Sequence, residues 1–296
     1  MEKQTENFAD LWQYVEKHKP NIEKTLREHL PLAPPNIETQ FNEAVEYALF
    51  SGGKRLRPVL TLLGAELFGG KTEIILPSAV AVEFIHTSSL IFDDLPCMDN
   101  ADKRRGKTSL HEKFGEGLAV LTAIGFLNAS YALVFVNHNQ MPQRAMQAHA
   151  EIVECVGASG MVGGQSVDLA LAKGVGDAGE LGDFESVRNL KTSALMRLAL
   201  RVGSILAGAN YLELAHLSRF AELLGDAYQL SDDLIDLEED DTIFGENKPI
   251  QKHTSADLQL RKTIEQAKRV LIDNFPTSEA RSCLIQLTHY LADRKN

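Results

Sequence analysis

Two clusters of aspartate are the strongest chemical signal in the sequence, because each directly follows an apolar stretch. The first lies in the run DDLPCMD and the second in the run DDLID. Together they contain Asp93, Asp94, Asp99, Asp232, Asp233 and Asp236. Adjacent carboxylates repel one another, so the placement needs a compensating charge. Mg²⁺ suits this role because it binds oxygen ligands and keeps waters for a phosphate partner. The clusters therefore predict a site for magnesium and phosphate.

The spacing within each cluster indicates how its carboxylates meet. On a helix, Asp232 and Asp236 are four residues apart and lie about 40° from each other on one face. In the first cluster Pro96 breaks the helix, so the chain must loop to return Asp99 to the site. A solvated acidic helix end is the alternative, and it is the better interpretation for residues 238–241. The apolar residues before the two clusters favour facing walls of one cavity.

Cationic side chains complement the carboxylates. They are Lys54, Arg55, Arg57, Arg104, Arg105 and Lys191. Arginine binds phosphate oxygens as a fork and lysine binds them as a point charge. Surface solvation would explain any one of them alone, but with the acidic clusters they predict a diphosphate site. His86 lies seven residues before Asp93, about 20° away around a helix, so both should face the same cavity. A buried core histidine is the alternative for His86.

The composition excludes several classes of protein. The 296 residues include 30 Lys+Arg and 41 Asp+Glu, a formal net charge of −11. This balance argues against a nucleic-acid partner, because phosphate backbones are bound by clustered Lys and Arg. A hydrophobic fraction of 44% excludes a disordered chain. Three scattered cysteines suit neither a disulfide framework nor a zinc site. The N-terminus lacks an apolar signal peptide. We therefore expect a cytoplasmic protein.

Helical periodicity runs through the chain, and strand signals are nearly absent. Pro20 and the segment LPLAPP should divide the first part into short helices. Long helices are predicted at residues 37–50, 55–68, 76–92, 118–136, 143–156, 185–207, 212–238, 255–275 and 277–294. No linker divides the sequence. Residues 1–296 are therefore predicted to form a single all-α domain, an enlarged helical bundle.

One predicted helix, at residues 118–136, is uncharged and long enough to span a bilayer. A buried core helix produces the same pattern. Thr122, Asn128 and Ser130 lie within it, and no Lys/Arg cluster flanks it. These features favour the core helix, so we expect no transmembrane span.

Five segments, in order along the chain, resemble the signature segments of the trans-prenyl diphosphate synthases. They are GGKRLRPVL, EFIHTSSLIFDDLPCMDNADKRRGKTSLH, GMVGGQSVDL, LKTSAL and GDAYQLSDDLID. The most similar type is the geranylgeranyl diphosphate synthase of bacteria and plants. The resemblance implies an all-α homodimer of the isoprenoid synthase type, with both aspartate clusters facing a central cavity. It also implies a reaction that joins isopentenyl diphosphate head to tail with dimethylallyl, geranyl or farnesyl diphosphate.

The resemblance implies roles around the allylic diphosphate. Three magnesium ions would lie between this diphosphate and the two aspartate clusters. Lys191 and Arg104 match residues that hold the allylic diphosphate. Thr192 and Gln229 match residues whose oxygens face the carbocation. The released diphosphate would take the last proton, so no protein base is assigned.

The resemblance also implies a pocket for isopentenyl diphosphate. Its residues would be Lys54, Arg57, His86 and Arg105. The sequence departs from the family pattern at Ala101 and Ile124, where aspartates are common. After the second cluster, Lys248 is the best match for a further substrate-binding lysine, Lys252 matches a second, and His253 replaces an aspartate.

Product length is expected to depend on the residues four and five places before Asp93. In this family bulky residues there stop the growing chain, and here they are the small Ser89 and Ser88. They would lie roughly 6–7.5 Å below Asp93 along the helix axis. Geranylgeranyl diphosphate is therefore the first expectation, a longer polyprenyl diphosphate the second, and a farnesyl-only product is disfavoured. Phe126 or Tyr131 on the next helix could stop a longer chain.

Two other classes of protein share parts of this pattern. A catalytically silent partner subunit would fit the irregular segment FGENKPIQKHT, but such proteins usually lose an aspartate cluster or its arginines. A terpene cyclase also ionises an allylic diphosphate between aspartate-rich helices. The intact second cluster, Lys54 and Arg57 argue against a cyclase.

Overall fold

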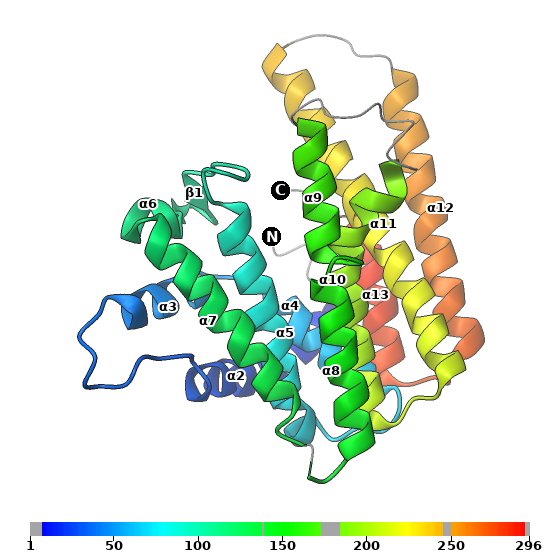
Figure 1. Ribbon diagram of the computed structural model, residues 1–296. Helices are drawn as coiled ribbons and strands as arrows, with labels where there is room; N and C mark the ends of the chain where they lie inside the picture. Colours follow the sequence, from blue (N-terminus) through cyan, green and yellow to red (C-terminus); the bar gives the residue numbers. More distant parts are fainter. Residues whose placement is uncertain (1–7, 138, 173–183, 245–249, 294–296) are drawn as a thin grey trace.

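Figure 1 shows the computed structural model, which describes residues 8–137, 139–172, 184–244 and 250–293. Helices dominate these ranges, which confirms the predicted all-α class. The helices are α2 (Ala9–Glu28), α3 (Phe41–Leu49), α4 (Leu56–Glu66), α5 (Thr72–Asp93), α6 (Leu110–Phe114), α7 (Glu116–Val134), α8 (Pro142–Val156), α9 (Met161–Ala172), α10 (Phe184–Ala207), α11 (Tyr211–Phe244), α12 (Ile250–Asn274) and α13 (Glu279–Asp293). The strands β1 (Lys103–Arg104) and β2 (Lys107–Thr108) pair antiparallel.

The long helices predicted from the sequence are present, with ends that differ by a few residues. Helix α9 was not expected, because the glycines at its start lower helix propensity. The expectation that Pro20 separates short helices is wrong, since Pro20 lies inside the continuous helix α2. A proline there costs one backbone hydrogen bond. The helix continues because its buried face, including Leu11, Ile22 and Leu26, packs into the core.

The hairpin of β1 and β2 is the one place where strand pairing occurs in the described chain. Its turn is formed by Arg105 and Gly106, whose φ angles are 53° and 74°. Positive φ at both central residues is the geometry that suits a tight two-residue hairpin. The hairpin matters for the site because it fixes Arg104 and Arg105 side by side after the first aspartate cluster.

Helix α5 is central to the arrangement (Figure 1), with α3, α6 and α7 on one side and α8 to α13 on the other. It packs against α7 and α4, while α10 packs against α4 and α11. Buried residues from α2 through α13 join one hydrophobic core. The described helices therefore share one core, and the single domain over residues 1–296 stays a prediction.

The helix expected to be a buried core element, α7, is covered on one face only. In its most apolar window 39% of residues are buried, whereas the figure for α5 is 78%. Both helices are long and apolar enough to cross a membrane by length and composition. On α7 the side chains of Leu121 and Ile124 are 57% and 51% exposed. The sequence pattern therefore identified the helix correctly but overstated its burial within one chain.

The close contact of α4 with α10 depends on two glycines. A Cβ at Gly203 would overlap the backbone carbonyl of Thr61, and a Cβ at Gly64 would overlap that of Leu200. Because these neighbours are backbone atoms, they cannot rotate away. The contact fixes α4, which begins beside the predicted substrate-binding residues.

We therefore expect Gly203→Ala to lower the free energy of unfolding by about 1–3 kcal/mol, as overpacked cores do. Gly117→Ala is the matched control, since a Cβ there meets nothing within 4 Å. In a helix that change should be neutral or stabilise by up to about 1 kcal/mol. Urea denaturation of both variants checks this, and equal effects would contradict the close contact.

Candidate active site

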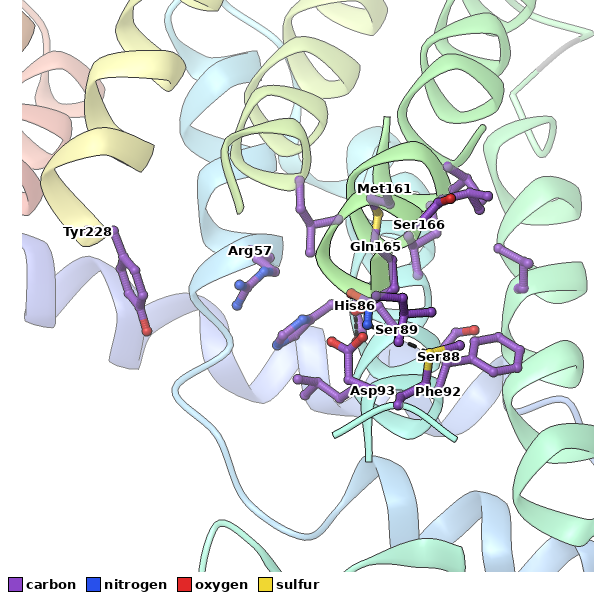
Figure 2. Close-up of a pocket in the computed structure, with 18 of the residues that line it drawn as sticks. Arg57, His86, Ser88, Ser89, Phe92, Asp93, Met161, Gln165, Ser166 and Tyr228 are labelled. Atoms are coloured by element: carbon purple, nitrogen blue, oxygen red, sulfur yellow. Dashed lines mark hydrogen bonds between the residues drawn. The ribbon is translucent and has the colours of Figure 1, made fainter. Parts of the chain in front are cut away.

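A cavity of about 690 Å³ lies against α5 and is also lined by residues of α4, α7, α8, α9, α10 and α11. Helix α5 contributes the largest share of the wall, namely Ile85, His86, Ser88, Ser89, Leu90, Phe92 and Asp93. In Figure 2, Arg57 and His86 lie on the side of Asp93 toward Tyr228, whereas Ser88 and Phe92 lie on its other side. The cavity thus has a cationic end and an apolar end. Its size falls within the range of about 300–1,000 Å³ typical of ligand pockets.

The first aspartate cluster lies where α5 ends. Helix α5 stops at Asp93, and the following loop turns back so that the Asp99 amide donates to the Asp93 carbonyl at 2.9 Å. Asp93 lines the cavity. Asp94 is 4% exposed and pairs with Arg104, whose Nε lies 2.9 Å from Asp94 Oδ1. This hydrogen bond raises the pKa of the half-buried Arg104, and the pair compensates the buried charge of Asp94.

The second aspartate cluster lies on α11. Tyr228 lines the cavity, and Asp232 follows it by four residues, which places both on the same face of the helix. Gln229 is half-buried next to Tyr228. The side chains of Asp233 and Asp236 lie outside the described part of the chain. The face that carries Asp232 is therefore turned toward the cavity that Asp93 lines from α5.

Some predicted site residues cannot be placed. Lys191 and Thr192 lie on α10, but their side chains are outside the described part of the structure. Lys248 falls between α11 and α12, outside the described residues. The same holds for the side chains of Lys252 and His253. Their roles stay predictions.

The structure brings together the cations predicted to bind isopentenyl diphosphate. The buried Nε of Arg57 makes no hydrogen bond within the described residues. Burial lowers the pKa of Arg57, although Glu83 opposes the effect. Arg105 Nη2 lies 3.5 Å from His86 Nε2. Burial, reinforced by Arg57 and Arg105, lowers the pKa of His86 well below its ordinary value. His86 is therefore uncharged at neutral pH, and the cluster attracts an anion.

Lys54 follows two glycines that the fold requires. Gly52 and Gly53 adopt φ angles of 118° and 129°, which residues with a side chain rarely adopt. Arg105 Nη1 donates to the Gly52 carbonyl at 2.5 Å. A Cβ at Gly53 would come within 2.7 Å of the same Arg105 atom. The glycines therefore let the loop carrying Lys54 lie directly against Arg105.

Arg55 has a structural role that the sequence did not reveal. Its guanidinium lies 2.8 Å from carboxylate oxygens of both Glu23 and Glu83 and donates to the Leu49 carbonyl. Burial alone would lower the pKa of Arg55, but the two glutamates outweigh it and raise the pKa. The expectation that Arg55 belongs to the phosphate-binding cations is therefore not supported, since its charge is already neutralised. It anchors the loop to α2 and α5.

The serines expected to control product length do line the cavity. Ser88 Oγ donates to the Ala123 carbonyl on α7, and Ser89 Oγ donates to the His86 carbonyl, each at 2.9 Å. Both hydroxyls are thus satisfied, and neither side chain obstructs the space. Of the two bulky candidates on α7, Phe126 packs in the core against Phe84, with ring centroids 5.1 Å apart.

The second candidate, Tyr131, contacts His149 instead of the cavity, with ring centroids 5.7 Å apart. Leu127 is the residue of α7 that lines the cavity. Adjacent helix residues differ by about 100° in direction, so this choice depends on the rotation of α7 about its axis. A single sequence does not determine that rotation.

Magnesium binds oxygen ligands, and the carboxylate of Asp93 at the end of α5 is a ligand of this kind. Within the described residues, no three His, Cys, Asp or Glu side chains are grouped closely enough to hold a metal ion by themselves. Asp93 lies on α5 and Asp232 lies on α11, so carboxylates from two helices are available to ions bridged by a phosphate group.

The comparisons with known proteins agree with the geometry of the cavity. The family model described as polyprenyl synthetase matches residues 38–266. The chain is 35% identical to geranylgeranyl pyrophosphate synthase 7, chloroplastic, of Arabidopsis thaliana, over 98% of this chain and 86% of that protein. It is 34% identical to a dimethylallyltranstransferase of Fischerella ambigua, over 98% and 85% of the two chains.

Solved structures give the same result. An FPP/GFPP synthase from Zymomonas mobilis superposes with a TM-score of 0.83 at 30% identity, covering 96% of this chain and 99% of that one. A geranyltransferase from Legionella pneumophila superposes with a TM-score of 0.79 at 30% identity, covering 98% of each chain. The similarity thus extends over nearly the whole chain, including helices outside the segment that the family model matches.

The neutral state of His86 predicts a pH effect on stability. The unfolded chain protonates this histidine below about pH 6.5, while the folded protein does not, so the unfolded state binds more protons. The free energy of unfolding should therefore fall as pH decreases below 6.5, by at most about 1.4 kcal/mol per pH unit from this group. His86→Gln is neutral at every pH and lacks this contribution. Denaturation of both proteins between pH 5.5 and 7.5, at one protein concentration, checks it. Parallel profiles would contradict the assignment.

Proposed function

Because the chain belongs to the polyprenyl synthetase family, we propose that its cavity joins isopentenyl diphosphate head to tail with an allylic diphosphate. The product is geranylgeranyl diphosphate. The observation that carries the proposal is a cavity with Arg57, His86 and Asp93 at one end and an apolar wall with two small serines at the other. An amphipathic ligand with an anionic head and an isoprenoid chain matches both ends.

The head of isopentenyl diphosphate is proposed to lie against Lys54, Arg57, His86 and Arg105. Support comes from Arg57, whose Nε is buried and without a hydrogen bond in the described chain. An unsatisfied buried donor is costly, and a diphosphate oxygen removes that cost. His86 adds a neutral hydrogen-bonding group beside Arg105. Within the described residues no ion pair joins Lys54, Arg57 or Arg105 to a carboxylate, so the pocket offers the charge that an anion needs.

The head of the allylic diphosphate is proposed to lie between the two aspartate clusters. Trans-prenyl synthases depend on magnesium as a class. We propose three ions here, held by Asp93, Asp94, Asp99, Asp232, Asp233 and Asp236. Bound magnesium would neutralise the leaving diphosphate, which makes its departure feasible. Arg104 keeps Asp94 paired when no ligand is present, and it matches a residue that holds the allylic diphosphate.

The remaining residues stabilise and shield the reacting carbon. Departure of the diphosphate leaves an allylic carbocation, which the double bond of isopentenyl diphosphate attacks. Thr192 and Gln229 are proposed to face this cation with their oxygens, while Lys191 and Lys248 contact the diphosphate. The released diphosphate accepts the proton that leaves the new allyl group. No side-chain nucleophile is needed in this sequence of steps.

We propose that the protein acts as a homodimer. The exposed face of α7 includes Leu121 and Ile124, and the neighbouring α8 exposes Met146 and Val153. Contiguous apolar surface of this kind marks a protein interface when it is extensive. A cytoplasmic location is proposed because all three cysteines are free, as expected in a reducing compartment.

The metal assignment predicts the effect of removing one carboxylate from each cluster. Asp93→Asn and Asp232→Asn should each lower kcat by about 10²–10³-fold, the typical loss when charge stabilisation is removed. Elongation of farnesyl diphosphate by labelled isopentenyl diphosphate measures this, with magnesium present and then chelated. Asp257→Asn is the control, because Asp257 is exposed and pairs with Arg261 on α12. Full activity in either cluster variant would remove that cluster from the metal site.

The open cavity at Ser88 predicts a change in product length. A tyrosine there would extend into space that the serine leaves free, so Ser88→Tyr should shift the main product to a shorter prenyl diphosphate. Ser88→Ala keeps the space open and should leave the product unchanged. Mass spectrometry of the dephosphorylated products compares the three proteins. An unchanged profile for Ser88→Tyr would show that this level of the cavity does not limit the chain.

A further inference from the structure

The ammonium group of Lys54 is held by aromatic side chains from both ends of the chain. Lys54 Nζ donates to Tyr290 Oη on α13 at 2.5 Å and lies 5.1 Å from the centroid of that ring. It lies 5.5 Å from the ring centroid of Trp12 on α2. A cation over the face of an aromatic ring and within about 6 Å of its centroid is attracted to the ring. For Tyr290 the main contact is the hydrogen bond to its hydroxyl, and Trp12 supplies the aromatic ring. We call Trp12 and Tyr290 the aromatic bracket.

The bracket is itself fixed by contacts between α2 and α13. The rings of Trp12 and Tyr290 meet edge to face, with centroids 5.2 Å apart, and the buried Phe8 packs against Tyr290 at 5.8 Å. Gln286 accepts from the Leu11 amide and donates to Asp10, at 2.9 and 2.8 Å. These contacts therefore hold both rings of the bracket in place. Neither helix falls within residues 38–266, the segment matched by the family model.

The neighbouring residue shows what is unusual about Lys54. Arg55 forms ion pairs with Glu23 and Glu83, whereas no ion pair joins Lys54 to a carboxylate in the described chain. Aromatic rings and a phenol oxygen attract an ammonium group without cancelling its charge. The ammonium has three donors, and Tyr290 uses one. Two donors and the full positive charge remain available for an anion.

We propose that Trp12 and Tyr290 are positioning residues that hold Lys54 ready for the diphosphate of isopentenyl diphosphate. This inference rests on the proposed function and extends it to residues outside the family segment. A free lysine side chain loses considerable rotamer freedom when it is immobilised on a ligand. The bracket restricts that freedom before the ligand arrives, so less binding energy is lost on association.

The experiment compares kinetic constants for the two substrates. Trp12→Leu and Tyr290→Leu should each raise KM for isopentenyl diphosphate about three- to tenfold, the range expected for a lost cation–π contact. The KM for farnesyl diphosphate and kcat should change by less than about twofold, because Lys54 is on the isopentenyl side. Trp12→Phe keeps an aromatic face and should restore most of the loss. In a Lys54→Ala background, Trp12→Leu should have no further effect.

Phe68→Leu is the control, since Phe68 forms an edge-to-face pair with Phe275 away from Lys54. It should alter stability without altering either KM. Unchanged KM values in folded Trp12→Leu and Tyr290→Leu would overturn the proposal, as would a fall in KM, which would mean that the bracket withholds Lys54. An equal rise for both substrates would show general damage and also overturn it. Absence of elongation by the wild-type protein would instead overturn the proposed function and the substrate role of the bracket with it.

Discussion

The protein, whose formal net charge is −11, must hold the anionic diphosphate head of its substrate beside an apolar isoprenoid chain. The rest of the structure depends on this constraint. Helix α5 meets both demands, because it carries His86 at the cationic end of the cavity, Ser88 and Ser89 along its wall, and Asp93 at its last turn. The apolar wall lowers the local polarity, which strengthens every charge interaction at the mouth. Different sides of one helix thus separate the charged residues from the wall proposed to face the isoprenoid chain, since His86 lies on the side of Asp93 toward Tyr228 and Ser88 lies on the other side (Figure 2).

The buried charges around the cavity divide into those already paired and those left for ligand. Arg55 is paired with Glu23 and Glu83 and has no proposed ligand, whereas Arg104 is paired with Asp94 in the structure and is proposed to bind the allylic diphosphate. Within the described residues, the buried Nε of Arg57 has no hydrogen-bond partner. Paired charges stabilise the loop and the hairpin, while this unpartnered donor costs folding free energy that the proposed diphosphate ligand would recover. Buried polar groups that lack a hydrogen-bond partner are expected at functional sites.

The sequence predicted most of this framework because its signals are local. Apolar periodicity located the long helices, and Pro96 after the aspartates predicted the loop that returns Asp99. The charge pattern alone grouped Arg55 with Lys54, because the pairing of Arg55 depends on Glu23 and Glu83, which are distant in sequence. The choice of Leu127 over Phe126 on α7 depends on a rotation about the helix axis. Partial exposure of α7 was missed because the same apolar pattern suits a core helix and an interface helix.

The most direct test is the size of the product made by the wild-type protein. Magnesium and isopentenyl diphosphate would be incubated with dimethylallyl, geranyl or farnesyl diphosphate, and the dephosphorylated alcohols would be sized by mass spectrometry. The open wall at Ser88 and Ser89 predicts alcohols longer than fifteen carbons, and the proposed function predicts that the main one has twenty carbons. Chains that stop at fifteen carbons would contradict the open wall. A folded protein that elongates no primer would contradict catalysis itself and would point to a silent partner subunit.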